Sequence, residues 1–373
     1  MIKNKKILHF HPNSTYASIF VSPLIRAEIK EGYDTKIISS TNFDLLANWT
    51  APYDLRLKNL FYLPFAFIKI YYILLTFRPD IVVAHNSRSA ALPLLVSKLT
   101  FAKIRIYFNH GVPYIGYSGI LLFFLKLLER INCNLSTEVI TVSSDMRNLL
   151  HSVAPQLKIT IIGSGSACGI DLKTFHPRQD AILKFRMEHQ IRSDDFVAVY
   201  IGRPNKRKGF VECLSLWIEN FLRPEYKLVL CGVSRLEVLE FLPFIPSNII
   251  CLGFTEEVPQ ILRESDCLLL PSFHEGFSYA ALESMASGCL VIANNIAGIR
   301  NLVTNHVSGF LVDGNDPRMY REYIELIRHN PDQFLDMRAK GHQVAQKYSR
   351  DIFLDSYLLF LNSTNNISNH LNS

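Results

Sequence analysis

Residues 267–288 read CLLLPSFHEGFSYAALESMASG. The four apolar residues 267–270 have the length of a short buried strand, and a loop that contains Gly276 separates them from a helical pattern that begins near Tyr279. A buried strand followed at once by a loop and a helix is typical of a βα unit, whose strands pair in parallel. We therefore interpret this stretch as one strand of a parallel sheet, together with the helix that covers it.

Comparable units repeat on both sides of this stretch. Short apolar runs that mostly end in polar or glycine residues lie at 7–10, 35–39, 81–84, 105–108, 139–142, 159–162, 196–201, 227–231, 249–252, 267–270, 290–293 and 310–312. Helix-length segments separate many of them, at 22–31, 60–77, 90–99, 119–131, 209–221, 258–265 and 280–287. This alternation predicts an α/β fold with two tandem Rossmann-like domains. We expect an interdomain cleft, because open parallel sheets bind ligands beyond the carboxyl ends of their strands.

The domain boundaries follow from where the alternation restarts. We expect an N-terminal domain over residues 1–165 and a C-terminal domain over residues 166–345. Residues 346–361 are expected to form a helix that packs back toward the N-terminal domain. The polar residues 362–373 are expected to be a disordered tail.

The overall composition is that of a globular protein. Of 373 residues, 49% are hydrophobic and 19% are charged, which argues against a disordered or fibrous chain. The seven cysteines are odd in number and contain no CxxC pair, so we expect reduced packing cysteines in the cytosol rather than a disulfide or zinc framework. No secretory signal is visible at the N-terminus.

The positive charge is concentrated in the first half of the chain. Residues 1–165 carry a net charge of +9, whereas the remainder carries −3. The very apolar, aromatic segments 60–77 and 120–128 lie in this basic half, flanked by Lys58, Lys69, Arg78, Lys126 and Arg130. They are open to three interpretations: core helices, helices that dip into a membrane interface, or a span, which Pro64 and Lys69 would interrupt. We expect an anionic membrane surface, and not nucleic acid, as the partner of this half.

The 271–288 segment carries two carboxylates in a position to bind a ligand. Glu275 lies in the loop after the strand, and Glu283 lies eight residues later in the helix. Carboxylates accept hydrogen bonds from sugar hydroxyls, and the amides at a helix start suit a phosphate. Gly276 lets the backbone approach a ligand because it lacks a Cβ atom. The alternative is that both glutamates are solvated surface residues.

A second candidate element, IGRPNKRKGF at 201–210, also follows a predicted strand. Arg203 and Lys208 are five positions apart around a turn, where two cations could neutralise a diphosphate leaving group. We expect Lys206 and Arg207 to be solvated.

The glycine-rich stretch IIGSGSACGID at 161–171 does not fit a dinucleotide fingerprint, because Cys168 stands where the third glycine belongs. We place Ser164, Gly165 and Ser166 at the rim of the cleft, on the acceptor side. His85, at a strand end, is a further candidate for acceptor contact. His9 and His11 alternate along one strand, but we see no carboxylate or cysteine set near them to complete a metal site, so no metal is expected.

Four segments together resemble a known family in order and spacing. They are GRPNKRKG, the LGF at 252–254, PSFHEGFSYAALESMASGCLVIA and AGIRNLV…GFLVDGND, and the N-terminal half agrees less densely through RPDIVVAHN, FNHG, ITVSSDM and GIDLKTFHP. The chain resembles family-4 retaining glycosyltransferases of the GT-B fold, and among these the bacterial enzymes of capsule, O-antigen or lipid-linked glycan assembly. The first loop, 11–15, lacks the family's glycines, Asn301 stands where a glutamate is frequent, and Cys168 where an asparagine is common.

The resemblance implies a role for each matching residue. Arg203 and Lys208 would bind the donor diphosphate, and Glu283 the ribose of the nucleotide. Glu275, with the amides of Gly276 and Phe277, would bind the donor sugar and phosphate, in a donor site completed by His274 and Ser278. His110 would lie near the sugar's hydroxymethyl group and the acceptor. The implied catalytic residues are Glu275, His110, Arg203 and Lys208, with no metal or other cofactor.

The expected activity is transfer of a hexose or N-acetylhexosamine, with retention, from a nucleotide diphosphate sugar, most simply UDP-linked, to a lipid-diphosphate-linked saccharide. The N-terminal domain would face the acceptor and the inner face of the plasma membrane, as a cytoplasmic peripheral protein. The C-terminal domain would hold the donor. Two alternatives stay open: a GT-B sugar-nucleotide 2-epimerase, and a non-catalytic sugar-nucleotide-binding scaffold of a glycan assembly complex.

Overall fold

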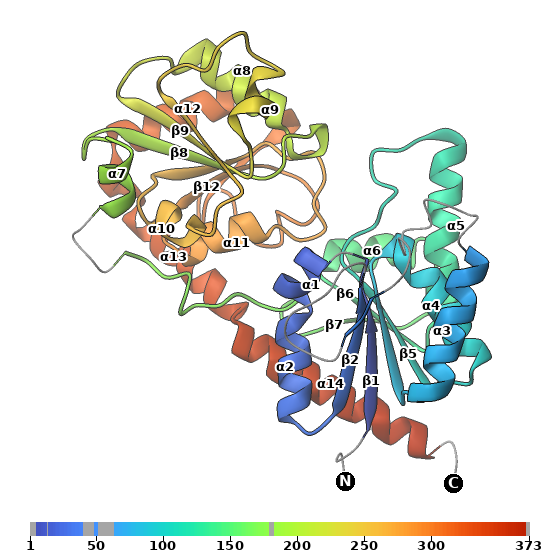
Figure 1. The fold of residues 1–373 in the computed structure, drawn as a ribbon. Coiled ribbons are helices and arrows are strands. Elements are labelled where there is room, and N and C mark those ends of the chain that lie inside the picture. The colour runs from blue at the N-terminus through green and yellow to red at the C-terminus, as the bar shows by residue number, and fades with distance from the viewer. Residues whose placement is uncertain (1–4, 13, 40–47, 51–62, 179–182, 371–373) are drawn as a thin grey trace. The chain divides into compact units, whose positions relative to one another are not determined.

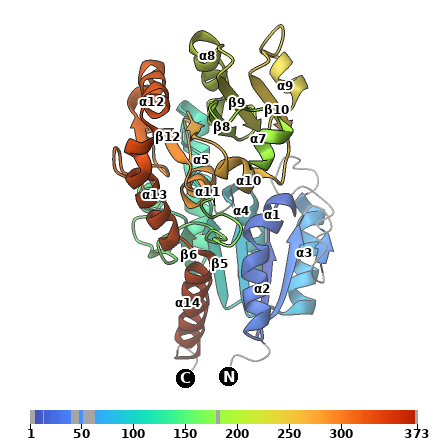
Figure 2. The same cartoon turned by 90° about the vertical axis from the view of Figure 1, so that its left-hand side faces the viewer.

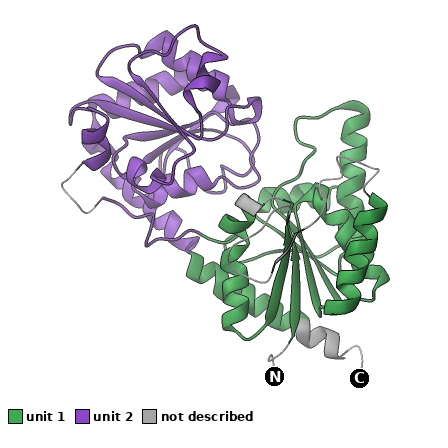
Figure 3. Ribbon diagram, viewed as in Figure 1, with its two compact units in different colours: residues 1–169, 350–373 green, residues 170–349 purple. Residues whose placement is uncertain are grey.

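The computed structural model describes residues 5–12, 14–39, 48–50, 63–178 and 183–370 (Figure 1). The chain forms two compact units, coloured separately in Figure 3. Unit 1 comprises residues 1–169 and 350–373, and unit 2 comprises residues 170–349. The first division thus falls after Gly169, beyond the expected boundary at 165. Residues 60–62 of the expected helix 60–77, and Asn13 in the first loop, lie outside the described residues.

Unit 1 is built on a parallel sheet of order β3-β2-β1-β4-β5-β6-β7. Its strands are β1 Lys6–Phe10, β2 Asp34–Ser39, β3 Asn48–Thr50, β4 Ile81–His85, β5 Ile104–Asn109, β6 Glu138–Thr141 and β7 Ile159–Ile161. Its helices are α1 Ser14–Phe20, α2 Ser22–Lys30, α3 Leu63–Phe77, α4 Ser87–Leu99, α5 Gly119–Leu135, α6 Ser144–His151 and α14 Arg350–His370. β1 pairs with both β2 and β4, so the strand order reverses beside it.

The core of unit 1 includes a layer that α3 packs onto the sheet. Leu8 of β1 and Val82 of β4 pack with Ile70 and Leu74 of α3 in one buried cluster. Strand side chains alternate between faces, whereas helix side chains repeat every three to four residues, so one face of α3 meets the sheet.

The long C-terminal helix α14 belongs to unit 1 and lies against α2 (Figures 1 and 2). The hydroxyl of Tyr357 donates to Glu28 of α2 over 2.7 Å, and Tyr33 donates to Asn362 over 2.9 Å. We expected this helix to end at residue 361, but α14 continues to His370. Two polar side chains at the start of this extension have partners: Asn362 accepts from Tyr33, and Thr364 is buried and donates to the Leu361 carbonyl.

Unit 2 repeats the same topology with a parallel sheet of order β10-β9-β8-β11-β12-β13. Its strands are β8 Phe196–Ile201, β9 Tyr226–Cys231, β10 Ile249–Gly253, β11 Cys267–Leu270, β12 Leu290–Asn294 and β13 Phe310–Val312. Its α-helices are α7 Lys184–Glu188, α8 Phe210–Asn220, α9 Arg235–Leu239, α10 Val258–Arg263, α11 Tyr279–Ala286, α12 Pro317–His329 and α13 Leu335–Lys347. Two parallel Rossmann-like sheets confirm the predicted fold class.

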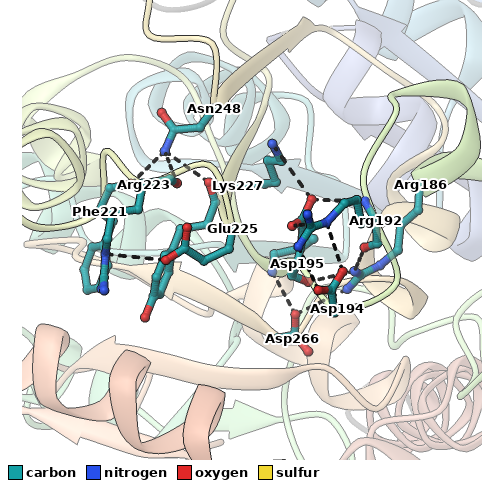
Figure 4. A network of polar contacts seen from close by, with 12 residues as sticks. Arg186, Arg192, Asp194, Asp195, Phe221, Arg223, Glu225, Lys227, Asn248 and Asp266 are labelled. Atoms are coloured by element: carbon teal, nitrogen blue, oxygen red, sulfur yellow. Dashed lines mark hydrogen bonds and ion pairs between the residues drawn. The ribbon is translucent and has the colours of Figure 1, made fainter.

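A network of hydrogen bonds and ion pairs lies at the amino ends of the strands in unit 2 (Figure 4). Asp266, just before β11, accepts a 2.7 Å hydrogen bond from the Val197 amide and lies 3.3 Å from Arg186. Asn248, just before β10, donates to the carbonyls of Phe221 and Tyr226. These contacts satisfy backbone groups where strands begin, at the end of the sheet opposite to the carboxyl ends beyond which open parallel sheets bind ligands.

The helices α3 and α5 each present apolar residues to solvent. On α5 the exposed large apolar residues are Ile120, Leu121, Phe123, Phe124, Leu127 and Ile131, which we call the apolar α5 face. On α3, Phe65, Ile68 and Tyr72 are each at least 65% exposed, while the opposite side of the helix is buried in the core. Within the described residues, no helix combines the length and the hydropathy that crossing a membrane requires.

Candidate functional site

The two segments predicted to hold a ligand in unit 2 follow neighbouring strands. β8 pairs in parallel with β11, and the strand order reverses between them. Residues 202–209 leave the carboxyl end of β8, and residues 271–278 leave the carboxyl end of β11. Open parallel sheets bind ligands where the order reverses, because the connections there depart to opposite faces. The topology therefore places both segments at one ligand-binding edge.

A buried carboxylate joins these two segments. Nζ of Lys208 donates to Oε1 of Glu275 over 2.7 Å, and Oγ of Ser272 donates to the same oxygen over 2.9 Å. The side chain of Glu275 is 7% exposed and that of Lys208 is 29% exposed. A carboxylate can be buried at this edge because the ammonium and hydroxyl groups offset its lost hydration. An ammonium group and a carboxylate thus lie side by side at the strand ends, a combination that suits a ligand with both phosphate and hydroxyl groups.

A residue that we expected to be solvated also links the segments. The backbone carbonyl of Arg207 accepts a 2.9 Å hydrogen bond from the Phe273 amide. Its side chain is exposed, yet Nε donates to the His274 carbonyl over 3.1 Å. Arg207 is therefore solvated, as expected, and in addition hydrogen-bonds across the two segments. Its pairing depends on which loops the sheet brings together, and nothing in the local sequence indicates it.

Two glycines allow the backbone to pack closely around the Lys208–Glu275 pair. A Cβ atom on Gly209 would collide with the Pro271 carbonyl, and one on Gly298 would lie 2.5 Å from the Glu275 carbonyl. Both residues also have left-handed φ angles, +66° and +80°, which favour glycine. Close backbone approach at these points sets the spacing between the two segments.

The segment after β11 ends in a capped helix start. Oγ of Ser278 accepts from the Ala281 amide, so Ser278 is the N-cap of α11, and it is buried. Gly276 and Phe277 directly precede this cap, and the Phe277 ring packs 5.4 Å from that of Tyr348. The amides of a helix start carry partial positive charge, which favours an anionic ligand group.

The remaining predicted residues of this site lie around the same strand ends. Arg203 is exposed, and its carbonyl accepts from the Tyr200 hydroxyl over 3.0 Å, which holds the turn. Glu283 lies in α11. Burial, followed by the charge of Glu283, raises the pKa of the Cys231 thiol at the end of β9 to about 12. His274 is partly buried, and burial, followed by the nearby Arg207, lowers the pKa of its imidazole.

His110 belongs to unit 1 and follows β5. Its ring stacks on Phe108 with a centroid distance of 4.7 Å, and its Nε2 lies 2.9 Å from Nδ1 of His85. Burial, followed by the proximity of His11, lowers the pKa of His110 to about 3. The imidazole is therefore neutral at physiological pH and suits hydrogen bonding rather than ionic contact.

His85 differs from what we expected. The His85 ring is fully buried, with Nε2 3.0 Å from Nδ1 of His9 and Nδ1 engaged by His110. His85 has no ring nitrogen left for the predicted acceptor contact. One carboxylate lies near His9, with Oε2 of Glu28 3.0 Å from its Nε2. In the described part of the chain, no three His, Cys, Asp or Glu residues are grouped to hold a metal ion.

The glycine-rich loop after β7 is mostly an internal turn. Ser166 is buried; its amide donates to the Val142 carbonyl over 2.7 Å, and its Oγ accepts from the Gly169 amide over 2.7 Å. A Cβ atom on Gly165 would clash with the same Val142 carbonyl. Of the three acceptor-side candidates in this loop, only Ser164 has an exposed side chain. The Ser166 hydroxyl is used to shape the loop, a role that its sequence context did not reveal.

Two family models match the chain, one in each unit. Residues 17–170 match the model described as Glycosyltransferase Family 4, and residues 182–346 match the model described as Glycosyl transferases group 1. The group 1 match contains Arg203, Lys208 and Glu275, and the family 4 match contains His85 and His110.

Curated relatives with sequence similarity include a capsular polysaccharide biosynthesis glycosyltransferase, CapM, of Staphylococcus aureus, which is 26% identical over 94% of this chain and 95% of its own length. A UDP-Gal:alpha-D-GlcNAc-diphosphoundecaprenol alpha-1,3-galactosyltransferase of Escherichia coli is 27% identical over 74% of this chain and 72% of its own length.

Solved structures with the same fold include a sucrose-phosphate synthase from Thermosynechococcus elongatus, with a TM-score of 0.83, 19% identity, and 96% and 99% of the two chains covered. HepE of Anabaena in complex with UDP-glucose has a TM-score of 0.77 at 16% identity, with 96% and 99% covered. At this identity the likeness concerns the fold.

Proposed function

The chain belongs to the glycosyltransferases whose two GT-B domains match the family 4 and group 1 models, and from the site in unit 2 we propose that it transfers a hexose or N-acetylhexosamine from a UDP-sugar to a lipid-diphosphate-linked saccharide. The observation that carries the proposal is the 2.7 Å contact between Lys208 and Glu275 at the reversal point of the sheet. It joins a cation for the diphosphate to a carboxylate for sugar hydroxyls in one site.

Each group of the donor would be bound by residues of unit 2 with matching chemistry. Arg203 and Lys208 would neutralise the diphosphate, assisted by the amides at the start of α11. Glu275 would accept hydrogen bonds from the hydroxyls of the transferred sugar, and Glu283 from those of the ribose. His110 of unit 1 would contact the transferred sugar. With two cationic side chains on the leaving group, no metal cofactor is needed in this proposal.

The acceptor assignment is supported by the relatives' names. The name of the E. coli relative specifies a UDP-sugar donor and a diphosphoundecaprenol-linked acceptor, and that of the S. aureus relative places it in capsule synthesis. An acceptor with a polyprenyl tail lies in a membrane, and the apolar α5 face, with Lys126 and Arg130 exposed on the same helix, suits an anionic bilayer surface. We therefore place the enzyme at the inner face of the plasma membrane.

The proposed reaction retains the configuration at the anomeric carbon. The bond from that carbon to the diphosphate oxygen breaks, and the acceptor hydroxyl oxygen bonds to the carbon on the same face. The departing phosphate oxygen takes the hydroxyl proton, and Arg203 and Lys208 stabilise the charge that develops on the diphosphate. Glu275 is engaged by Lys208 and Ser272, which favours a binding role over that of a nucleophile.

The test is a transfer assay with a panel of UDP- and GDP-sugars and a synthetic lipid-diphosphate saccharide, with product mass and anomeric configuration read out. A UDP-sugar should give a disaccharide product with an α linkage, and EDTA should leave the rate unchanged. A UDP-sugar incubated without acceptor should not be epimerised. Epimer formation without acceptor would favour the 2-epimerase, and donor binding without turnover would favour the scaffold; either result contradicts the proposal.

A further inference from the structure

A chain of hydrogen bonds inside unit 1 leads from α14 to His110. The Tyr357 hydroxyl donates to Oε1 of Glu28 over 2.7 Å, and both oxygens of Glu28 lie within 3.1 Å of Nε2 of His9. From His9 the chain continues through Nδ1 to Nε2 of His85 over 3.0 Å, and from Nδ1 of His85 to Nε2 of His110 over 2.9 Å.

The residues that precede His110 in this chain are sealed from solvent. The side chains of Tyr357, Glu28, His9 and His85 are all 0% exposed. They come from four separate elements: α14, α2, β1 and β4. Hydrogen bonds in such a buried interior are stronger than in water and polarise one another.

The carboxylate at one end sets the direction of every bond in the chain. An ionised Glu28 can only accept, so Nε2 of His9 must donate to it. A neutral imidazole carries one proton, which leaves Nδ1 of His9 as an acceptor for Nε2 of His85. By the same reasoning, Nδ1 of His85 accepts from Nε2 of His110.

This alternation requires one proton on each imidazole, because a second proton on His9 would make both of its ring nitrogens donors and reverse the two bonds that follow. Burial lowers the pKa of His85 well below its ordinary value, and the neighbouring His110, His9 and His11 lower it further. His110 is neutral for the reason given above. His11 lies beside this chain rather than in it, with Nε2 2.9 Å from the side-chain amide of Asn86.

We infer that Glu28, acting through His9 and His85, holds His110 in the tautomer that carries its proton on Nε2 and presents Nδ1 as a hydrogen-bond acceptor. The inference rests on the proposed function, in which His110 contacts the transferred sugar. Among the described residues, Nδ1 of His110 has no hydrogen-bond partner, so it is the nitrogen that a sugar hydroxyl would reach.

This arrangement makes Glu28, His9 and His85 positioning residues and gives His110 a part in donor selection. An acceptor nitrogen binds a hydroxyl that donates to it and gives nothing to a deoxy analogue. One hydrogen bond of this kind corresponds to about a tenfold difference in kcat/KM between the hydroxylated and the deoxy sugar.

The direct test is a long-range ¹H–¹⁵N correlation spectrum of the full chain with ¹⁵N-labelled histidine, recorded without substrate. Protonated and unprotonated ring nitrogens are distinguished in this spectrum, and the His110 signals are identified by their loss in the His110→Asn variant. In the wild-type protein, the His110 proton should be on Nε2. A proton on Nδ1 overturns the inference, whatever the variants do.

Variants at Glu28 test whether the carboxylate sets the tautomer. In Glu28→Gln the amide oxygen can accept from Tyr357 while its NH₂ group donates to His9, which reverses the chain; in Glu28→Met the acceptor is gone. The Nε2–H share of His110 should fall in both. Tyr357→Phe leaves the carboxylate as an acceptor and should retain the tautomer. An unchanged tautomer in both Glu28 variants overturns the inference.

Activity separates this inference from the proposed function. Because a hydroxyl can accept as well as donate whereas an O-methyl ether only accepts, Glu28→Gln should lower the ratio of kcat/KM for the hydroxylated sugar over its O-methyl analogue by about tenfold. Equal losses with both sugars would show a merely structural effect and overturn the role in selection. If the wild-type protein shows the Nε2 tautomer but transfers no sugar, the proposed function fails while the tautomer assignment stands.

Discussion

Nζ of Lys208 and Oε1 of Glu275, 67 positions apart in the chain, lie 2.7 Å from each other and join the loops after β8 and β11. This ion pair places opposite charges at the point where the sheet order reverses. Arg207 adds two hydrogen bonds between the same loops, to the Phe273 amide and the His274 carbonyl. These contacts hold the two loops together, so a substitution in one loop should also change the conformation of the other.

Replacement of Glu275 by Gln tests the carboxylate of this pair. The amide keeps the shape and can still accept from Ser272, but the charge that holds Lys208 is lost. We expect kcat/KM for transfer to fall by about tenfold to a hundredfold, with the fold retained. Steady-state kinetics together with circular dichroism measures both, and full activity in a folded variant would contradict the role of Glu275.

Gly209 should be the glycine of unit 2 that tolerates a side chain least. In Gly209→Ala the new Cβ would collide with the Pro271 carbonyl, and φ is left-handed at +66°. Gly314→Ala is the matched control, because its φ is +63° and a Cβ there has open space. We expect about 1 kcal/mol of destabilisation at Gly314, from the backbone alone, and a clearly larger loss at Gly209. Equal losses of unfolding free energy in Gly209→Ala and Gly314→Ala would contradict the close contact between Gly209 and the Pro271 carbonyl.

Glu129 should make unit 1 less stable as the pH rises. Burial raises the pKa of this carboxyl from 4.5 to about 7, although Ser87, Tyr107 and Asn109 hydrogen-bond to it. Since the folded state holds the proton more tightly, the stabilisation is fully present below pH 4.5 and is lost as the pH rises through 7. Glu129→Gln imitates the protonated form. Relative to wild type, its unfolding free energy should increase by up to about 3 kcal/mol between pH 4.5 and 8.

Urea unfolding at a series of pH values measures this difference, with native-state hydrogen exchange of the β5 amides to identify the transition of unit 1. Glu31→Gln, at an exposed carboxylate of the same unit, is the control and should follow the wild-type pH profile. A constant difference between Glu129→Gln and wild type from pH 4.5 to 8 would show that Glu129 does not titrate in this range.

The apolar α5 face should bind anionic vesicles. Phe123 and Phe124 are 62% and 56% exposed, and Lys126 and Arg130 are exposed on the same helix. We expect co-sedimentation with vesicles of anionic phospholipid that weakens from 0.05 to about 0.5 M salt, because the Debye length shortens over that range. Replacing Phe123 and Phe124 by Ser should weaken binding at both salt concentrations. Absent or salt-insensitive binding would contradict the proposed membrane contact.

Much of the fold could be predicted because parallel strands are strongly patterned. The predicted strands at 196–201, 267–270 and 310–312 have the bounds that the structure has, since each is a compact apolar run between polar, glycine or proline residues. β3 Asn48–Thr50 was not predicted, because three residues are too few to show the alternation of apolar and polar side chains typical of a strand, and its sequence contains no apolar run. The end of α14 was placed too early because polar composition alone does not reveal that Asn362 reaches Tyr33.

The loops that form the candidate site could be predicted from the sequence, but the contacts between their side chains could not. Arg203, Lys208 and Glu275 stand in segments that follow strands, so their common edge could be inferred from topology. The pairing of Arg207 with His274, and of His9 with Glu28, depends on which loop or helix crosses which strand. A single sequence does not contain that information, because the partners are separated by 67 and 19 positions with no shared pattern.

The most direct test of the account compares transfer by wild type, Lys208→Ala and Lys206→Ala. Lys206 lies in the same 3₁₀ turn, Lys206–Lys208, and is exposed, so its removal changes the local charge equally without touching Glu275. With a UDP-sugar and a lipid-diphosphate saccharide, Lys208→Ala should lower kcat by about a hundredfold or more, because the leaving diphosphate loses its partner. Lys206→Ala should transfer at the wild-type rate. Wild-type turnover in Lys208→Ala would contradict the proposal that the Lys208–Glu275 site performs the transfer.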